Sequence, residues 1–265
     1  MMRLTPPNHQ KIAQATSLDI QYGGSEANVA VSLAQFGLQS AYITRVPNTD
    51  LGRAALGQLA KYGVDTTPSV FGGARLGLYF LEMGAGLRGS KVVYDRAHSG
   101  VASLEKGMID WEIALHGVTW LHWSGITPAV SQSAADVTLE ALKTAQKMGI
   151  TVSCDLNYRA NLWQYGKHPA DIMPELLQNS NVMLGDGDTI DLYFGIKGAN
   201  YAEVFEKTAA AFPNLDYLAM TARKAFHASH NTYKGFLYSK HFENDKILTS
   251  QEYDMPEILD RIGGG

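Results

Sequence analysis

Hydrophobic and polar positions along the chain change period repeatedly, from a helical spacing of three to four residues to the short apolar runs of buried strands. From about residue 23, helical segments that end at a glycine alternate with runs rich in Val, Leu, Ile and aromatic residues. This alternation is typical of βα units around a parallel sheet, so the sequence predicts an α/β fold. The predicted helices cover about Ser25–Phe36, Leu51–Tyr62, Ser131–Met148 and Tyr201–Phe212. The predicted strands cover Ser40–Val46, Thr119–Trp123, Thr151–Asp155, Asn181–Gly185 and Tyr217–Thr221.

The first predicted helix has a distinct apolar face. Val29, Leu33 and Phe36 share that face, and alanines between them allow a neighbouring element to approach closely. Gly37 is expected to end the helix, because glycine adopts the left-handed conformation found after many helices.

Residues 68–96 read as an antiparallel hairpin, with strands at Leu76–Met83 and Lys91–Arg96. The connecting residues, 84–89, match the G-x-G-x-x-G dinucleotide fingerprint, but that motif requires a helix after the glycines and here a strand follows. The match is discarded. The hairpin is either a lid over a pocket or a surface ribbon. A second hairpin is predicted from Gly235–Tyr238 and Ile247–Tyr253.

Composition narrows the class of protein. The chain has 265 residues, 45% of them hydrophobic, which is enough for one large domain with a substantial core. Its net charge of −4 provides no basic field for nucleic acid. A single cysteine, Cys154, excludes a disulfide framework and reads as a buried small hydrophobe. The sequence shows neither a signal peptide nor a run of about 20 apolar residues, so we expect a cytoplasmic protein without membrane contact.

Polar residues follow four of the predicted strands. In open parallel sheets, ligands bind beyond the carboxyl ends of the strands, so these residues mark the expected site. Polar residues follow any strand that leads into a loop, but an Asp, an Asn and an Arg within five residues after Cys154 are harder to attribute to solvent alone. The residues concerned are Ser124, Asp155, Asn157, Tyr158, Arg159, Asp186, Asp188, Thr221, Arg223 and Lys224.

Two further segments carry candidate ligand-binding groups. Gly23 and Gly24 open the first helix and let a polyhydroxylated ligand approach the backbone, while Asn28 offers a donor and an acceptor. An ordinary helix start explains the same residues. Arg96 ends the hairpin, where it is either a surface charge or a bidentate partner for a carboxylate.

Several familiar site types are not indicated. His227 and His230 are three residues apart, but no third ligand is evident, so no metal site is assigned and both are expected in a loop. The sequence contains neither a P-loop nor a G-x-S-x-G elbow, which leaves a P-loop phosphotransferase and a serine hydrolase without support.

Long segments of the chain resemble the PfkB or ribokinase-like carbohydrate kinases, and most of all those that act on 2-keto-3-deoxygluconate. The segments are GGSEANVAVSLAQFG, TRVPNTDLGRAALGQLAKYGVDT, GARLGLYFLE, KVVYDRA, SCDLNYR, TARKAFHASHNT and DRIGGG. The resemblance implies a doubly wound, mostly parallel α/β core with helices on both faces (residues 23–67 and 97–265) and a small β lid (residues 1–22 and 68–96). It also implies ATP and Mg²⁺ as cosubstrates, phosphorylation of a sugar acid at a primary hydroxyl, and a homodimer formed through the lid.

The resemblance carries over to individual residues. Gly23, Gly24 and Asn28 match the sugar-binding helix start, and Tyr79, Tyr94 and Arg96 match positions that hold the sugar acid. On the nucleotide side it implies Asn157, Arg159, Thr221, Arg223 and Ser229 to Asn231. Arg159 is implied at the junction of substrate and triphosphate, with a catalytic role. Gly263, Gly264 and Gly265 match the anion hole, whose backbone N–H groups face the transferring phosphoryl group.

Two departures from the family pattern alter these expectations. The family's Asn-x-x-Glu motif, which helps to order Mg²⁺, is replaced by residues 186–189, leaving Asp186 to act through water. The family's base is an aspartate directly after the glycine run, and its first core strand precedes the equivalent of Met1; a polypeptide that ends at Gly265 is expected to show no turnover. A kinase for a neutral sugar such as fructose or ribose, and an inactive sugar-binding homologue, stand as the alternatives.

Overall fold

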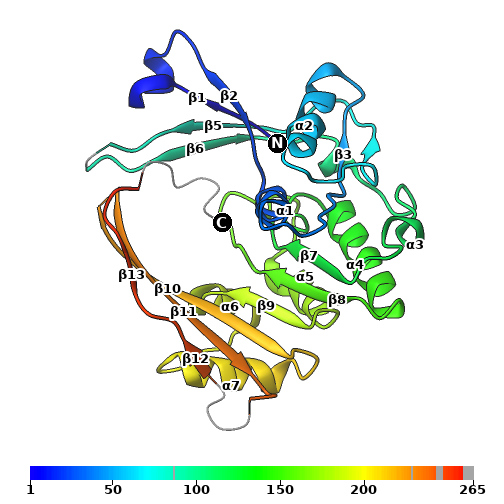
Figure 1. The fold of residues 1–265 in the computed structure, drawn as a ribbon, viewed down its shortest axis with the longest axis vertical. Helices are drawn as coiled ribbons and strands as arrows, with labels where there is room; N and C mark the ends of the chain where they lie inside the picture. The colour runs from blue at the N-terminus through cyan, green and yellow to red at the C-terminus, as the bar shows by residue number, and fades with distance from the viewer. Residues whose placement is uncertain (86, 228, 243–246, 259–265) are drawn as a thin grey trace. The chain divides into compact units, whose positions relative to one another are not determined.

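The computed structural model describes residues 1–85, 87–227, 229–242 and 247–258 (Figure 1). These residues divide into two compact units. Unit 1 contains the described parts of 1–104, 225–231 and 254–265, and unit 2 contains those of 105–224 and 232–253. Gly263, Gly264 and Gly265 lie outside the described residues, so the predicted anion hole stays a prediction.

Unit 1 is built on a small mixed sheet. Its strands are β1 (Met2–Thr5), β2 (Asp19–Tyr22), β3 (Arg45–Val46), β4 (Val70–Phe71), β5 (Leu78–Glu82) and β6 (Lys91–Asp95). Its helices are α1 (Ser25–Gln35) and α2 (Asp50–Lys61), with 3-10 turns at Pro7–His9, Ile12–Gln14 and Val101–Ser103. Four strands form one sheet in the order β2-β1-β5-β6, in which β1 runs parallel to β5 and the other pairs are antiparallel. The antiparallel pairing of β5 and β6 confirms the hairpin predicted in residues 68–96. A strand, β6, follows the discarded glycine motif, as expected.

Alternation along the strands gives this sheet two different faces. On each face, directly paired residues of the four strands form a row that runs across the sheet. The polar row is Gln21, Arg3, Tyr79 and Tyr94; the apolar row is Ile20, Leu4, Phe80 and Val93. On the apolar face, Met2 packs with Leu56 of α2 and with Leu76 in one buried cluster. The polar face is therefore not used to bury α2.

Helix α1 starts where it was predicted but buries a different face. Ala27 and Ala30 are buried and pack with Leu59 of α2, whereas Phe36 is 82% exposed. The prediction that Val29, Leu33 and Phe36 form the buried face of this helix is therefore wrong. Small side chains let the two helices approach closely, so the alanine stripe makes the contact. Gly37 has φ of 83° and ends the helix as predicted.

The predicted strand Ser40–Val46 is mostly absent. Only Arg45–Val46 form a ladder, with β4, and Ala41 forms an isolated bridge. The Thr44 N–H donates to the Ser69 hydroxyl at 3.2 Å. Because this donor binds a side chain, the backbone ladder is interrupted at that point.

Unit 2 contains the parallel strands. Its elements are α3 (Trp111–Ala114), β7 (Trp120–Ser124), α4 (Gln132–Lys147), β8 (Thr151–Asp155), α5 (Pro169–Leu177), β9 (Val182–Gly185), α6 (Gly187–Phe194), α7 (Tyr201–Ala211) and β12 (Ile247–Thr249), with parts of β10 (Tyr217–His227), β11 (His230–Ser239) and β13 (Tyr253–Met255). Residues 225–227 of β10, 230–231 of β11 and 254–255 of β13 belong to unit 1. The sheet order is β12-β11-β10-β9-β8-β7, with β13 also paired to β11 (Figure 1). Strands β7 to β10 are mutually parallel. The predicted mixed α/β fold with a parallel sheet is confirmed.

The parallel strands form the core of unit 2. Val152, Cys154, Met183 and Leu218 on successive strands have no exposed surface. Cys154 is thus the buried residue that its sequence context predicted. Helix α4 begins after Ser131, whose hydroxyl accepts from the Ala134 N–H at 3.1 Å, a standard N-cap.

Strand β10 is longer than predicted and extends to His227 instead of ending at Thr221. Thr221 and Arg223 therefore lie on a strand, not in a loop as expected, because β11 pairs alongside β10. The second predicted hairpin is confirmed as β11 and β12, although the segment 247–253 divides into β12 and β13. None of the helices in the described part of the chain is long and apolar enough to cross a bilayer.

Candidate functional site

The glycine-rich start of α1 meets the polar face of the small sheet. A methyl group placed on Gly23 would lie 3.4 Å from the Tyr79 hydroxyl and 3.6 Å from Asn28 Oδ1. Three predicted residues, two from the start of α1 and one from the distant strand β5, therefore surround one small space. Gly23 is paired with Met1 through two backbone hydrogen bonds of 2.9 and 3.1 Å, which fixes this space against the sheet. The arrangement presents a hydroxyl and an amide oxygen beside an open backbone, which suits a polyhydroxylated ligand.

Two tyrosines and an arginine extend this surface. Tyr79 lies opposite Tyr94 across β5 and β6, with ring centroids 6.1 Å apart. The Arg96 guanidinium carbon lies 4.6 Å from the centre of the Tyr94 ring, which is a cation–π contact. A methyl group on Gly77 would lie 3.4 Å from Arg96 Cβ, so Gly77 and Arg96 are neighbours. Six of the seven residues predicted to bind the substrate belong to unit 1, and the seventh, Arg159, belongs to unit 2. The contacts within unit 1 bring together Gly23, Asn28, Tyr79, Tyr94 and Arg96.

Arg3 belongs to the same row but was not predicted as a site residue. It lies on β1 beside Tyr79 and is only 8% exposed. The alternation of Met2, Arg3, Leu4 and Thr5 was the one available signal, since it places Arg3 and Thr5 on a shared face of a strand.

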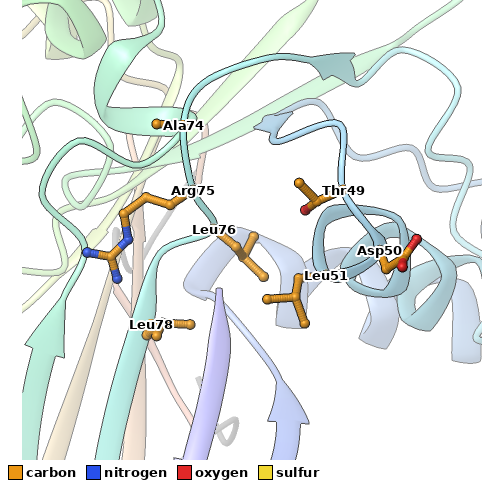
Figure 2. A pocket seen from close by; sticks show the side chains of 7 residues that line it. All are labelled: Thr49, Asp50, Leu51, Ala74, Arg75, Leu76 and Leu78. Carbon is orange, nitrogen blue, oxygen red and sulfur yellow. The ribbon is translucent and has the colours of Figure 1, made fainter.

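A cavity of unit 1 lies on the other side of the sheet. It has a volume of about 440 Å³ and is lined by Thr49, Asp50, Leu51, Ala74, Arg75, Leu76 and Leu78. Figure 2 shows Leu51 and Leu76 pointing toward one another, while the Arg75 guanidinium points away from them. That guanidinium forms a bidentate pair with Asp95, with both contacts at 2.6 Å. The cavity is leucine-lined, and none of the predicted residues lines it.

In unit 2, a tight turn follows β8. The Asn157 N–H donates to Asp155 Oδ1 at 3.1 Å, and Asn157 has φ of 38°, in the left-handed region that asparagine tolerates. Arg159 is exposed, and its guanidinium donates to the neighbouring Tyr158 carbonyl at 2.8 Å. The two predicted residues of this turn therefore lie at the carboxyl end of a central parallel strand, where ligands bind in such sheets.

Leu156 anchors the turn. It is fully buried, and its N–H donates to the Leu184 carbonyl at 2.9 Å. A methyl group on Gly125 would lie 2.2 Å from the Leu156 oxygen, and one on Gly185 would lie 2.8 Å from its side chain. Only glycine fits at position 125, where the clash is with backbone, whereas a methyl group at position 185 would require the Leu156 side chain to shift.

Tyr193 of α6 completes the anchor. Its hydroxyl donates to the Leu156 carbonyl at 3.1 Å, and its ring contacts Tyr158 edge-on at 5.9 Å between centroids. Burial raises the pKa of Tyr193 well above its ordinary value, so the hydroxyl stays protonated and remains a donor. Tyr193 was not predicted, because a tyrosine inside an apolar helix gives no sign of such a contact.

Asp186 caps the helix that carries Tyr193. Its two carboxylate oxygens accept from the Thr189 N–H at 2.9 Å and from the Thr189 hydroxyl at 2.8 Å. The side chain is exposed, so its remaining lone pairs face solvent. Among the described residues, no three His, Cys, Asp or Glu side chains gather as a metal-binding group.

The remaining nucleotide-side residues lie on β10 and β11. Thr221 and Arg223 are exposed and share one face of β10, since they are two residues apart. Asn231 is 2% exposed, so its side chain is not at the surface. His227 ends β10 and His230 begins β11, with ring centroids 5.6 Å apart, and His230 Nε2 lies 2.6 Å from Asp254 Oδ1.

Relatives of the chain are carbohydrate kinases. The model of the pfkB family of carbohydrate kinases matches residues 1–216. A 2-dehydro-3-deoxygalactonokinase from Haloferax volcanii is 36% identical over 163 residues, which cover 62% of this chain and 51% of the relative. A 5-dehydro-2-deoxygluconokinase from Clostridium perfringens is 27% identical over 212 residues, covering 79% of this chain and 60% of the relative. The chain thus spans about half to three fifths of the length of these curated relatives.

A solved structure extends the likeness to the fold. The 2-dehydro-3-deoxygluconokinase of Thermotoga maritima superposes with a TM-score of 0.91 at 40% identity, covering 98% of this chain and 80% of that chain. The protein has a parallel sheet with polar strand ends and a small sheet with tyrosines and an arginine on one face. Together with the likeness to these relatives, this places it in the class of α/β carbohydrate kinases. The chain belongs to the pfkB family of carbohydrate kinases, and its fold is ribokinase-like.

Proposed function

We propose that this protein phosphorylates a 2-keto-3-deoxy sugar acid with ATP, giving the 6-phosphate of 2-keto-3-deoxygluconate. The observation that carries the proposal is the polar face of the small sheet, where Arg96 lies 4.6 Å over the Tyr94 ring and Tyr79 reaches the space beside Gly23. Two solved or curated relatives carry names that specify 2-dehydro-3-deoxy sugar acids, and 2-dehydro is another name for 2-keto.

The charge on this face supports an acid rather than a neutral sugar. A guanidinium binds a carboxylate with two parallel hydrogen bonds, whereas a neutral polyol needs no cation. Stacking on Tyr94 would hold the Arg96 fork in one plane before the ligand arrives. Asn28 and Tyr79 would then bind hydroxyl groups further along the chain of the sugar. Fructose and ribose offer no carboxylate for Arg96 to bind, which disfavours the neutral-sugar alternative.

The chemistry of unit 2 suits the nucleotide. Arg159 would bind the transferring phosphoryl group, and Asn157 would orient the triphosphate beside it. Arg223 and Thr221 would bind the nucleotide along β10, and Ser229, Asn231 and the residues 263–265 remain predictions for the same ligand. ATP bound with Mg²⁺ supplies the phosphoryl group and neutralises its charge. The fixed turn after β8 would align the reactants, which is the main requirement of phosphoryl transfer.

The test is to identify the product. The protein is incubated with ATP, Mg²⁺ and either 2-keto-3-deoxygluconate or its C4 epimer 2-keto-3-deoxygalactonate, and the products are examined by phosphorus and carbon NMR. We expect a phosphomonoester on C6 of at least one epimer. Phosphorylation of fructose or ribose in preference to both acids would overturn the proposal.

The apolar face of the same sheet supports a homodimer through the lid. Ile20 is 59% exposed and Val93 is 42% exposed, at the two ends of the apolar row. A second copy of this chain would cover them. Sedimentation analysis should show a dimer that dissociates in the Ile20→Lys and Val93→Lys variants, and a monomeric wild type would contradict this. The lid boundaries and the cytoplasmic location stay predictions.

A further inference from the structure

Trp163 has an unusual backbone conformation. Its φ of 65° lies in the left-handed region, which bulky residues seldom adopt because Cβ then crowds the carbonyl oxygen. Such a conformation costs free energy and persists only where the surrounding contacts hold it in place. Trp163 lies in the segment between β8 and α5, four residues after Arg159. The strained residue and the predicted partner of the phosphoryl group therefore belong to the same segment.

Backbone hydrogen bonds fix the end of this segment. The Trp163 N–H donates to the Ala129 carbonyl at 3.0 Å, which ties the segment to the loop between β7 and α4. The Leu162 N–H donates to the Arg159 carbonyl at 3.0 Å, which closes a tight turn that begins at Arg159. The side chain of Leu162 is buried beneath this turn, with 7% of its surface exposed. The conformation at Trp163 thus decides where the turn containing Arg159 meets the neighbouring loop.

The indole ring of Trp163 contacts two tyrosines that anchor the segment. It meets the Tyr193 ring edge-on at 6.4 Å and stacks on the Tyr165 ring at 5.9 Å, both measured between centroids. Tyr193 anchors the beginning of the segment through the Leu156 carbonyl, as described above. Tyr165 anchors the end, because its hydroxyl donates to the Pro128 carbonyl at 2.6 Å. One ring therefore links the anchors at the two ends of the segment.

Arg159 lies between these fixed ends and is itself exposed. Its guanidinium contacts the carbonyl of the adjacent Tyr158 at 2.8 Å. An arginine side chain has many rotamers, so the position of its backbone limits where the guanidinium can reach before a ligand binds. Phosphoryl transfer depends on alignment of the reacting groups, and a small displacement of one binding group lowers its contribution strongly. A fixed turn at Arg159 would supply that alignment.

We infer that Trp163 is a positioning residue for Arg159. Its left-handed backbone directs the chain toward Ala129, and its ring joins the two tyrosine anchors, so the turn that begins at Arg159 keeps one conformation. The inference rests on the proposed function, in which Arg159 binds the phosphoryl group transferred from ATP. ADP lacks that phosphoryl group. Trp163 should therefore affect the binding of ATP and leave the binding of ADP unchanged.

The test measures the affinities for ATP and for ADP by calorimetry, with Mg²⁺ present in both titrations. Trp163→Gly removes the ring at a position where glycine adopts the same φ freely, so the path of the chain is allowed but no longer fixed. We expect ATP to bind about fivefold more weakly and the affinity for ADP to change by less than about twofold. Arg159→Met should show the same selective loss. Adding Trp163→Gly to Arg159→Met should cause no further loss, because both changes remove one contact.

His98→Gly is the matched control for the introduction of glycine at a left-handed position. His98 is exposed, has φ of 56° and belongs to unit 1. The affinities of this variant for ATP and ADP should equal those of the wild type.

The outcomes separate this inference from the proposed function. Absence of binding of either nucleotide to the wild type contradicts the proposed function, and unchanged ATP affinity in Arg159→Met contradicts the role given to Arg159; the inference fails in both cases. If Arg159→Met loses ATP affinity selectively and Trp163→Gly does not, only the inference is overturned. An equal loss for ATP and ADP, or a further loss in the double variant, also overturns it, because both indicate a purely structural role. Should Trp163→Gly fail to fold, the ATP-to-ADP affinity ratio of Trp163→Phe decides in the same way.

Discussion

The Tyr193 hydroxyl donates to the Leu156 carbonyl at 3.1 Å, across 37 residues of sequence. Replacing Tyr193 by Phe removes this donor and leaves the buried carbonyl unsatisfied, which costs about 1–3 kcal/mol. We expect a matching loss of stability in urea unfolding and several-fold weaker ATP binding in calorimetry, because the turn carrying Asn157 and Arg159 loosens.

Tyr238→Phe is the control for this substitution. Tyr238 is also buried, and its ring stacks on Phe205 at 5.7 Å between centroids, away from the turn. Unchanged ATP affinity in Tyr193→Phe, with stability lost, would show that the contact supports the fold without positioning the turn.

Alkaline pH should unfold the protein through its buried tyrosines. Burial raises the pKa of Tyr165 to about 12 and that of Tyr193 further, against an ordinary value of 10.0. The raised values mean that stability is fully present below pH 10 and is lost as pH rises, since the unfolded chain releases these protons first. Phenolate absorbance and circular dichroism should change together above pH 10. A stability that stays constant from pH 9 to 12 would contradict these shifts.

Gly125→Ala should disrupt the turn more severely than any side-chain change nearby. Its methyl group would lie 2.2 Å from the Leu156 oxygen, which is backbone and cannot rotate away. We expect a loss of about 3 kcal/mol or more by urea unfolding, as for strong overpacking. Gly187→Ala, where a methyl group meets nothing within 4 Å at the start of α6, should be neutral or stabilising. Equal effects of the two substitutions on stability would contradict the close packing of Gly125 against the Leu156 carbonyl.

Gly23→Ala should separate binding from folding. The methyl group would make ordinary contacts of 3.4 and 3.6 Å with Tyr79 and Asn28, so stability should change by less than about 1 kcal/mol. It would fill the space assigned to the ligand, and we expect at least tenfold weaker binding of 2-keto-3-deoxygluconate. Gly57→Ala, in open space on α2, should leave binding unchanged. If Gly23→Ala bound 2-keto-3-deoxygluconate as tightly as the wild type, the space beside Gly23 would not belong to the binding site.

Candidate substrate-binding residues could be named from the sequence because they lie in long, specific segments, and their role stays a prediction. Gly23, Tyr79 and Arg96 come from three such segments, and the structure brings them onto one face. Arg3 was not predicted, because its only local signal is the alternation over the four-residue strand Met2–Thr5. Its place beside Tyr79 depends on the register with β5, which no local pattern encodes.

Tertiary packing explains the other differences. Phe36 fits the helical period of α1, but Ala27 and Ala30 pack on α2 because small residues permit closer approach. Thr221 ends an apolar run and thus resembles a strand end, yet pairing with β11 continues the strand to His227. Period and composition thus predict which elements exist, while partners decide how far they extend and which face they bury.

The preference for a sugar acid is tested most directly by calorimetric titration of the wild-type protein with 2-keto-3-deoxygluconate and, separately, with fructose. It requires no turnover and addresses the face that Arg96, Tyr94 and Tyr79 present. We predict that the acid binds at least tenfold more tightly, a difference of about 1.4 kcal/mol or more. Equal affinity for the two ligands, or tighter binding of fructose, would contradict the assignment of a sugar-acid kinase.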